Sequence, residues 1–171
     1  MIEVKVQSLG LDQSSKTPVV ILQEEDGKRI LPIWIGPAEA SAIAMELAGM
    51  KFARPLTHDL TASLIRGLGG ELNRVLISRV EDNTYFAELV IRRGEQVFSV
   101  DARPSDSIAI ALRLRAQLFA TEDLFDATSV QLADDQNGAE IAEEATEGMT
   151  PEQLQEYLKK LNPEDLGRFH P

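Results

Sequence analysis

Strand patterns joined by short turns alternate with helix patterns along this chain, and their order is the feature that most limits its fold. Alternating or β-branched apolar runs cover residues 2–8, 18–23, 29–35, 72–80, 84–93 and 96–102. Helix patterns cover residues 38–48, 58–68 and 106–115. Because strands joined by hairpins pair antiparallel, we expect an α+β domain with an antiparallel or mixed sheet of about six strands and three main helices, in the order βββααβββα.

Residues with special backbone preferences mark the expected turns and helix ends. Asp82-Asn83 is typical of a hairpin turn, and Gly36-Pro37 ends a strand just before a helix. Thr57 is typical of a helix N-cap, and Ser105 and Asp106 are both suited to cap the third helix. These local signals support the division into strands and helices given above.

The composition changes after residue 133, which predicts the end of the folded domain. Residues 134–149 contain six acidic residues and no basic one, a composition that cannot bury enough apolar surface to order itself. We therefore expect a domain over residues 1–133, an acidic flexible linker over 134–149 and a tail over 150–171.

A short helix is expected in this tail. Thr150-Pro151-Glu152-Gln153 has the pattern of a capping box with proline at the first helical position, and Leu154, Leu158 and Leu161 follow at helical spacing. An isolated helix of about ten residues is marginally stable in water because nucleation is costly. We expect it to dock on its own domain, on a second copy or on a partner protein.

The composition also excludes several classes of protein. No run of about 18 apolar residues is present, and the charged N-terminus lacks the apolar stretch of a signal peptide. The absence of cysteine excludes a disulfide scaffold, a cysteine zinc site and a thiol nucleophile. We therefore expect a cytoplasmic protein with no membrane contact.

The balance of charge is acidic but uneven. The 28 acidic and 17 basic residues give a net charge of −11, which argues against a general nucleic-acid coat. Residues 54–115, however, carry nine Arg, no Lys and eight acids. Arginine suits two-point contacts with phosphate or carboxylate, although it also pairs with acids on neighbouring strands. This stretch is therefore where a binding or catalytic site is expected.

Ionisable side chains gather at the start of each expected helix. The clusters are Glu39 after Gly36-Pro37, Arg54 with His58 and Asp59, and Asp101 with Arg103 and Asp106. Free N–H groups at a helix start favour anions, but a carboxylate there also simply stabilises the helix dipole. None of these clusters is a specific catalytic motif by itself.

Three ordered strings carry a resemblance to a known family. LPIWIGPAEASAIAMELAG (31–49), RPLTHDL (54–60) and DARPSDSIAIALRLRA (101–116) resemble the bifunctional nuclease family. The resemblance covers residues 1–130. It implies a compact α+β domain that often self-associates, and an activity on both DNA and RNA such as plant members of the family have.

The candidate site follows from what phosphodiester cleavage requires: an activated water, neutralised charge at phosphorus and a proton for the leaving group. The expected catalytic residues are His58, Asp59, Asp101 and Asp106, with His58 as general acid or base. The expected phosphate-binding residues are Arg54 and Arg103. The expected ligands of Mg²⁺ or Mn²⁺ are Glu39, Asp59, Asp101 and Asp106. We expect these groups to form one polar cluster, in which Asp59 or Asp101 contacts Arg54, Arg103 or an ion.

The sequence thus favours a metal-assisted nuclease with DNA and RNA as substrates. The alternative is a non-catalytic binding or regulatory module that uses the same polar pocket for an anion or a partner, and a third reading is a purely structural oligomer. Self-association is expected because the helix over 38–48 is apolar around much of its circumference.

Overall fold

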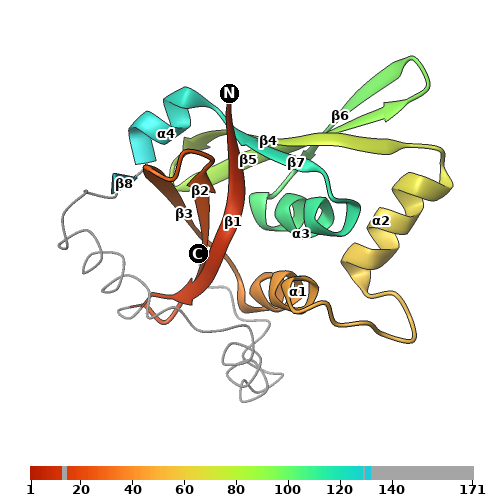
Figure 1. Cartoon of the computed structure of the whole chain (residues 1–171), viewed down its shortest axis with the longest axis horizontal. Helices are drawn as coiled ribbons and strands as arrows, with labels where there is room; N and C mark the ends of the chain where they lie inside the picture. Colours follow the sequence, from red (N-terminus) through yellow and green to blue (C-terminus); the bar gives the residue numbers. More distant parts are fainter. Residues whose placement is uncertain (13–14, 129, 132–171) are drawn as a thin grey trace.

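Two groups of hairpin-joined strands form one eight-stranded mixed sheet in the computed structural model, which describes residues 1–12, 15–128 and 130–131 (Figure 1). The strands are β1 (Ile2–Leu11), β2 (Pro18–Glu24), β3 (Arg29–Trp34), β4 (Glu71–Glu81), β5 (Thr84–Arg93), β6 (Gln96–Ala102), β7 (Gln117–Ala120) and β8 (Val130–Gln131). Their order across the sheet is β6-β5-β4-β7-β1-β2-β3-β8. The β4–β7 pair is parallel, and the other neighbours are antiparallel.

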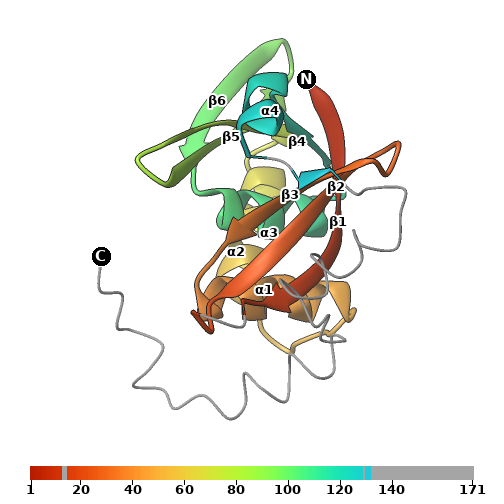
Figure 2. The ribbon, with the colours of Figure 1, turned by 90° about the vertical axis from the view of Figure 1, so that its left-hand side faces the viewer.

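The helices of the described residues are α1 (Pro37–Leu47), α2 (Thr57–Gly67), α3 (Pro104–Leu114) and α4 (Glu122–Thr128). The first three gather on one side of the curved sheet, and α4 packs over β3 and β4 (Figures 1 and 2). Helix α3 contacts α1, α2, β4 and β5, and its residues 108–111 are all buried. It is therefore the central helix, which explains its almost continuous apolar sequence.

The hydrophobic core lies between these helices and the sheet. Its largest fully buried side chains are Leu22, Leu31, Ile33, Ile43, Ile77, Ile108 and Phe125. At the β4–β5 hairpin, Asp82 and Asn83 both have positive φ, 47° and 59°, which is the backbone of the hairpin turn that their sequence predicts. The turn holds β4 against β5, on which α3 packs.

The α+β class and the order of the first nine elements are confirmed. Strands β7 and β8 and helix α4 extend the predicted order. Strand β7 lies between β4 and β1, so it joins the two hairpin groups into one sheet. Two cap assignments were wrong: Leu56 rather than Thr57 precedes α2, and Arg103 rather than Ser105 or Asp106 precedes α3.

The predicted acidic linker, residues 134–149, and the predicted tail helix lie outside the described residues. Within the described ranges, none of the helices combines the length and apolar character needed to cross a membrane.

Candidate functional site

Helices α1, α2 and α3 each carry an acidic side chain at their third residue. These residues are Glu39, Asp59 and Asp106. In α1 and α3 the first helical residue is a proline preceded by an extended residue, Gly36 or Arg103. Proline has no N–H to leave unsatisfied, and its fixed φ suits the start of a helix. The local sequence therefore sets where each carboxylate stands.

Four side chains from these helix starts meet in one group, here called the His58 cluster: Glu39, His58, Arg103 and Asp106. Nε2 of His58 lies 2.9 Å from Oδ1 of Asp106. Arg103 donates from Nε to Oδ2 of Asp106 at 2.7 Å and from Nη2 to Oδ1 at 3.2 Å. The same Nη2 lies 2.8 Å from Oε1 of Glu39. The cluster therefore links the starts of α1, α2 and α3.

Burial differs within the His58 cluster. The side chains of Glu39, His58 and Asp106 are 13%, 15% and 27% exposed, whereas that of Arg103 is 62% exposed. The carboxylates and the imidazole are thus held inside, and the guanidinium group forms the solvent-facing side. An anion from solution would meet Arg103 first.

The charge states of Asp106 and Arg103 follow from this arrangement. Burial opposes ionisation of Asp106, but hydrogen bonds from Arg103 and His58 outweigh it and lower the pKa of the Asp106 carboxyl. The hydrogen bond to Asp106 likewise raises the pKa of Arg103. Asp106 is therefore a carboxylate, and Arg103 a cation, throughout the neutral pH range.

The imidazole of His58 has two distinct nitrogens. With its proton on Nε2, the ring donates to the Asp106 carboxylate, and Nδ1 is left as a proton acceptor. None of the described residues forms a hydrogen bond with Nδ1. The arrangement can therefore take up a proton at Nδ1 while Asp106 holds the ring in place.

Asp59 lies next to His58 in the chain but belongs to a different ion pair. Its Oδ1 accepts from Nε of Arg113 at 2.5 Å, and its Oδ2 accepts from the N–H of Leu56 at 2.9 Å. Arg113 also donates to the carbonyls of Ala109 and Ala42, and its side chain is only 6% exposed. The hydrogen bond from Arg113 is the main cause that lowers the pKa of Asp59. Arg113 thus ties α3 to α2 and α1.

Arg54 and Asp101 stand apart from the His58 cluster. Arg54 is exposed in the connection between α1 and α2, and Asp101 is exposed on β6, opposite Glu88 of β5. The side chain of neither residue forms a hydrogen bond or ion pair with a described residue. The expected contact of Asp59 or Asp101 with Arg54 or Arg103 is therefore not formed. The structure brings together His58, Arg103, Asp106 and Glu39.

The expected metal ligands do not form a metal site in this arrangement. In residues 1–12, 15–128 and 130–131, no three Asp, Glu or His side chains are grouped as a metal ion requires. Asp106 and Glu39 accept hydrogen bonds from Arg103, and both oxygens of Asp59 are occupied. These carboxylates do not fit Mg²⁺ or Mn²⁺ in their present contacts. Binding of a divalent cation stays a prediction.

Arg113 was not singled out from the sequence, although it is the most buried of the arginines in ion pairs described here. One signal was present: Arg113 stands four residues after Ala109, on the buried side of an otherwise apolar helix. A charged residue in such a position needs a partner. The sequence does not say which acid supplies it, because Asp59 is 54 residues away.

This chain belongs to the bifunctional nuclease domain family, whose family model matches residues 20–133. An uncharacterized protein of Mycobacterium tuberculosis is 38% identical over 167 residues, which span 96% of this chain and 97% of that protein.

Plant proteins of the same family are more distant. Bifunctional nuclease 2 of Oryza sativa subsp. japonica is 28% identical over 116 residues, 66% of this chain and 36% of that protein. Bifunctional nuclease 1 of Arabidopsis thaliana is 28% identical over 102 residues, 57% of this chain and 31% of that protein. The chain thus matches about a third of each plant nuclease.

Proposed function

We propose that this protein hydrolyses phosphodiester bonds in DNA and RNA at the His58 cluster. The observation that carries the proposal is the 2.9 Å contact between His58 and Asp106 beside the exposed guanidinium of Arg103. An oriented imidazole and a neighbouring cation are two of the groups that phosphodiester hydrolysis requires. The names of the plant relatives add support.

In the proposed reaction each member of the His58 cluster has a defined role. Nδ1 of His58 takes the proton of a water molecule as its oxygen attacks phosphorus. The new P–O bond forms, the P–O bond to the leaving nucleotide breaks, and the leaving oxygen takes up a proton from solvent or from His58. Asp106 stabilises the imidazolium, Arg103 contacts the phosphate oxygens, and Glu39 positions Arg103.

Fluorescently quenched DNA and RNA oligonucleotides, incubated with the purified full-length chain, test this proposal. The variant is His58→Gln, and the matched control is His170→Gln, since the chain has two histidines. Loss of cleavage in His58→Gln, with activity retained in His170→Gln and an unchanged melting temperature in both, would support it. Equal cleavage by all three proteins would refute it.

The same assay with EDTA tests the expected divalent cation. A nuclease that uses the His58 cluster as it stands keeps its activity in EDTA. If EDTA abolishes cleavage, and Mg²⁺ or Mn²⁺ restores it, an ion takes part and Arg103 must release a carboxylate to bind it. The second outcome would overturn the roles given to Arg103 and Glu39.

A non-catalytic module that assembles with a second copy of itself is the other candidate. One observation favours it: an apolar cavity of about 310 Å³ lined by Leu64 of α2, by Leu68 just after that helix, and by Phe98 and Val100 of β6. Strand β6 is an edge of the sheet, and all its residues before Ala102 are exposed. An exposed edge strand can pair with its own copy about a two-fold axis. A wild-type protein that forms dimers but cleaves no nucleic acid would favour this candidate.

A further inference from the structure

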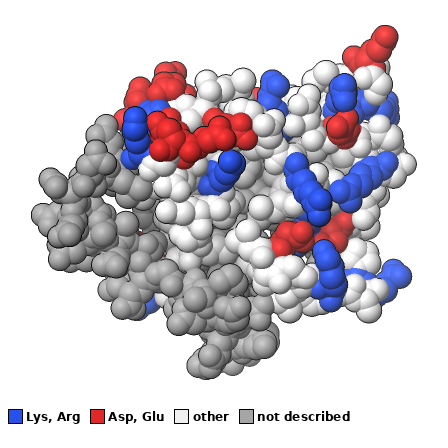
Figure 3. All heavy atoms as spheres, in the orientation of Figure 1, with Lys and Arg blue, Asp and Glu red and all other residues white. Residues whose placement is uncertain are grey.

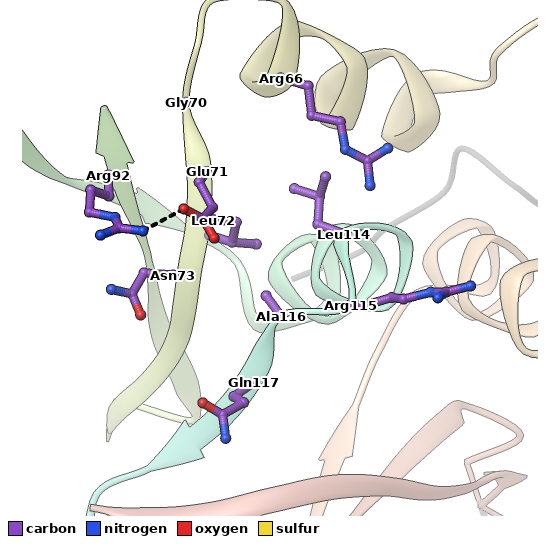
Figure 4. Close-up of a pocket in the computed structure, with 10 residues that line it drawn as sticks. All are labelled: Arg66, Gly70, Glu71, Leu72, Asn73, Arg92, Leu114, Arg115, Ala116 and Gln117. Atoms are coloured by element: carbon purple, nitrogen blue, oxygen red, sulfur yellow. Dashed lines mark hydrogen bonds and ion pairs between the residues drawn. The ribbon is translucent and has the colours of Figure 1, made fainter. Parts of the chain in front are cut away.

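A second and larger cavity, of about 540 Å³, lies at the far ends of α2 and α3 from the His58 cluster (Figure 4). Arg66 and Arg115 come from the ends of these helices, and Arg92 and Asn73 lie across the cavity on β5 and β4. From His58 to Arg66 the helix advances about 12 Å, at 1.5 Å per residue. The cavity is therefore separate from the candidate active site.

The charges that line this cavity are mostly positive. Three of its lining residues are arginines, and Glu71 is the acid among them. Glu71 pairs with Arg92 at 2.7 Å, and it is the one carboxylate beside three guanidinium groups in the lining. In Figure 3, basic side chains also gather on the side of the molecule where α2 and the end of α3 lie. This local excess stands out in a chain whose net charge is −11.

Two of the three arginines have no acidic partner. Arg66 donates to the backbone carbonyl of Arg113 at 3.4 Å, and the side chain of Arg115 forms no hydrogen bond or ion pair with a described residue. An anion bound in the cavity would supply negative charge that the lining lacks. The planar guanidinium group is suited to two-point contact with phosphate oxygens.

The inner wall of the cavity is apolar. Leu72 is buried, and Leu114 and Ala116 are half-buried beside it. A wall of this kind beside cationic and amide groups fits a ligand with an anionic end and a less polar body, as in a nucleotide. Asn73 and Gln117 add amide groups that can hydrogen-bond a sugar or base.

We propose that this cavity binds the phosphate group of a nucleotide, either free or within a nucleic-acid strand, with Arg66 and Arg115 as its principal contacts. Binding here needs neither His58 nor Asp106, so phosphate binding at this cavity does not depend on the proposed nuclease activity. In a nuclease, such a site would hold a phosphate other than the one that is cleaved.

Calorimetric titration of the full-length chain tests the proposal with four probes: thymidine, thymidine 5′-monophosphate, inorganic phosphate and a single-stranded oligothymidylate. The variant is Arg66→Gln/Arg115→Gln. The control is Lys5→Gln/Lys28→Gln. It also removes two positive charges, but from exposed ion pairs on β1 and on the β2–β3 turn.

The expected result is that thymidine does not bind and that at least one phosphate-bearing probe does. That probe should bind about tenfold more weakly for each arginine removed, and normally to the lysine control. Binding of the monophosphate or inorganic phosphate identifies a free ligand, and binding of the oligothymidylate alone identifies a strand. Equal binding by wild type and Arg66→Gln/Arg115→Gln, an equal loss in the lysine control, or no binding of any probe would overturn the proposal.

Discussion

Asp106 of α3 holds His58 of α2 across 48 residues of sequence, with 2.9 Å between Oδ1 and Nε2. Its other oxygen accepts from Arg103, so one carboxylate orients the imidazole and fixes the neighbouring cation. Such a carboxylate is a positioning residue: it would not touch the substrate but would set the direction in which His58 presents Nδ1.

Asp106→Asn should therefore lower the rate of nucleic-acid cleavage by about a hundredfold or more, because an amide no longer stabilises the imidazolium or holds the ring in one tautomer. The reduction should appear in kcat rather than in KM, and the pH–rate profile should change shape. Asp123→Asn is the matched control, since Asp123 is an exposed residue of α4. Unchanged kcat and pH profile in Asp106→Asn would remove Asp106 from the site.

The pH dependence of stability should reveal the Asp59–Arg113 ion pair. Hydrogen bonding from Arg113 lowers the pKa of Asp59 below the ordinary value of 3.8 for an aspartate. The folded state therefore gains stability above the unfolded pKa, and this gain is lost as pH falls through the folded pKa. Urea unfolding should therefore give wild type a clearly higher free energy of unfolding than Asp59→Asn at pH 7. This difference should shrink below about pH 4. A difference that is independent of pH would show that the pair contributes no charge-dependent stability.

Loss of Arg113 should cost more stability than loss of any exposed arginine. Arg113→Ala leaves the carboxylate of Asp59 and the carbonyl of Ala42 without their shared donor. We expect the free energy of unfolding to fall by about 2 kcal/mol, less than for a fully buried pair because Asp59 is 30% exposed.

Urea unfolding at pH 7 measures this cost, with Arg115→Ala, two residues away and exposed, as the control. Arg113→Met combined with Asp59→Asn should recover part of the loss, because the double variant leaves neither charge of the pair without its partner. An Arg113→Ala variant as stable as Arg115→Ala would contradict a structural role for the pair.

Local signals explain why most of the fold was predictable. The hairpin at Asp82-Asn83 and the prolines at the starts of α1 and α3 act within a few residues, so their effects are visible in the sequence. Strand β7 was missed because its four residues become a strand only by lying between β4 and β1. That pairing depends on tertiary structure rather than on local preference.

The candidate site was predictable in part for the same reason. The acids at the helix starts are local features, but the choice of partner is not: Asp59 pairs with Arg113, whereas Asp106 pairs with His58 and Arg103. Asp101 and Arg103 were expected together because residues two apart in a strand project from the same face. Strand β6 ends at Ala102, however, and Arg103 is the residue that precedes α3.

Self-association was inferred from the apolar sequence of α1, but most of that apolar surface is covered within the chain. Ala40, Ile43 and Ala44 are buried, in a helix that packs on α3 and β2. A group of exposed apolar side chains lies instead along α2 and its end and on β6, with Leu64 at 54% and Leu68 at 70%. If the protein assembles, this face is the one that gains most from being covered.

Leu64→Glu should therefore dissociate any wild-type oligomer to a monomer of 18.9 kDa, because it places a charge in the apolar cavity between α2 and β6. The matched control is Leu47→Glu, since Leu47 is 41% exposed at the end of α1. Light scattering coupled to size-exclusion chromatography at micromolar concentration measures both masses. A wild-type monomer, or dissociation by Leu47→Glu alone, would show that the α2–β6 face does not pair with a second copy.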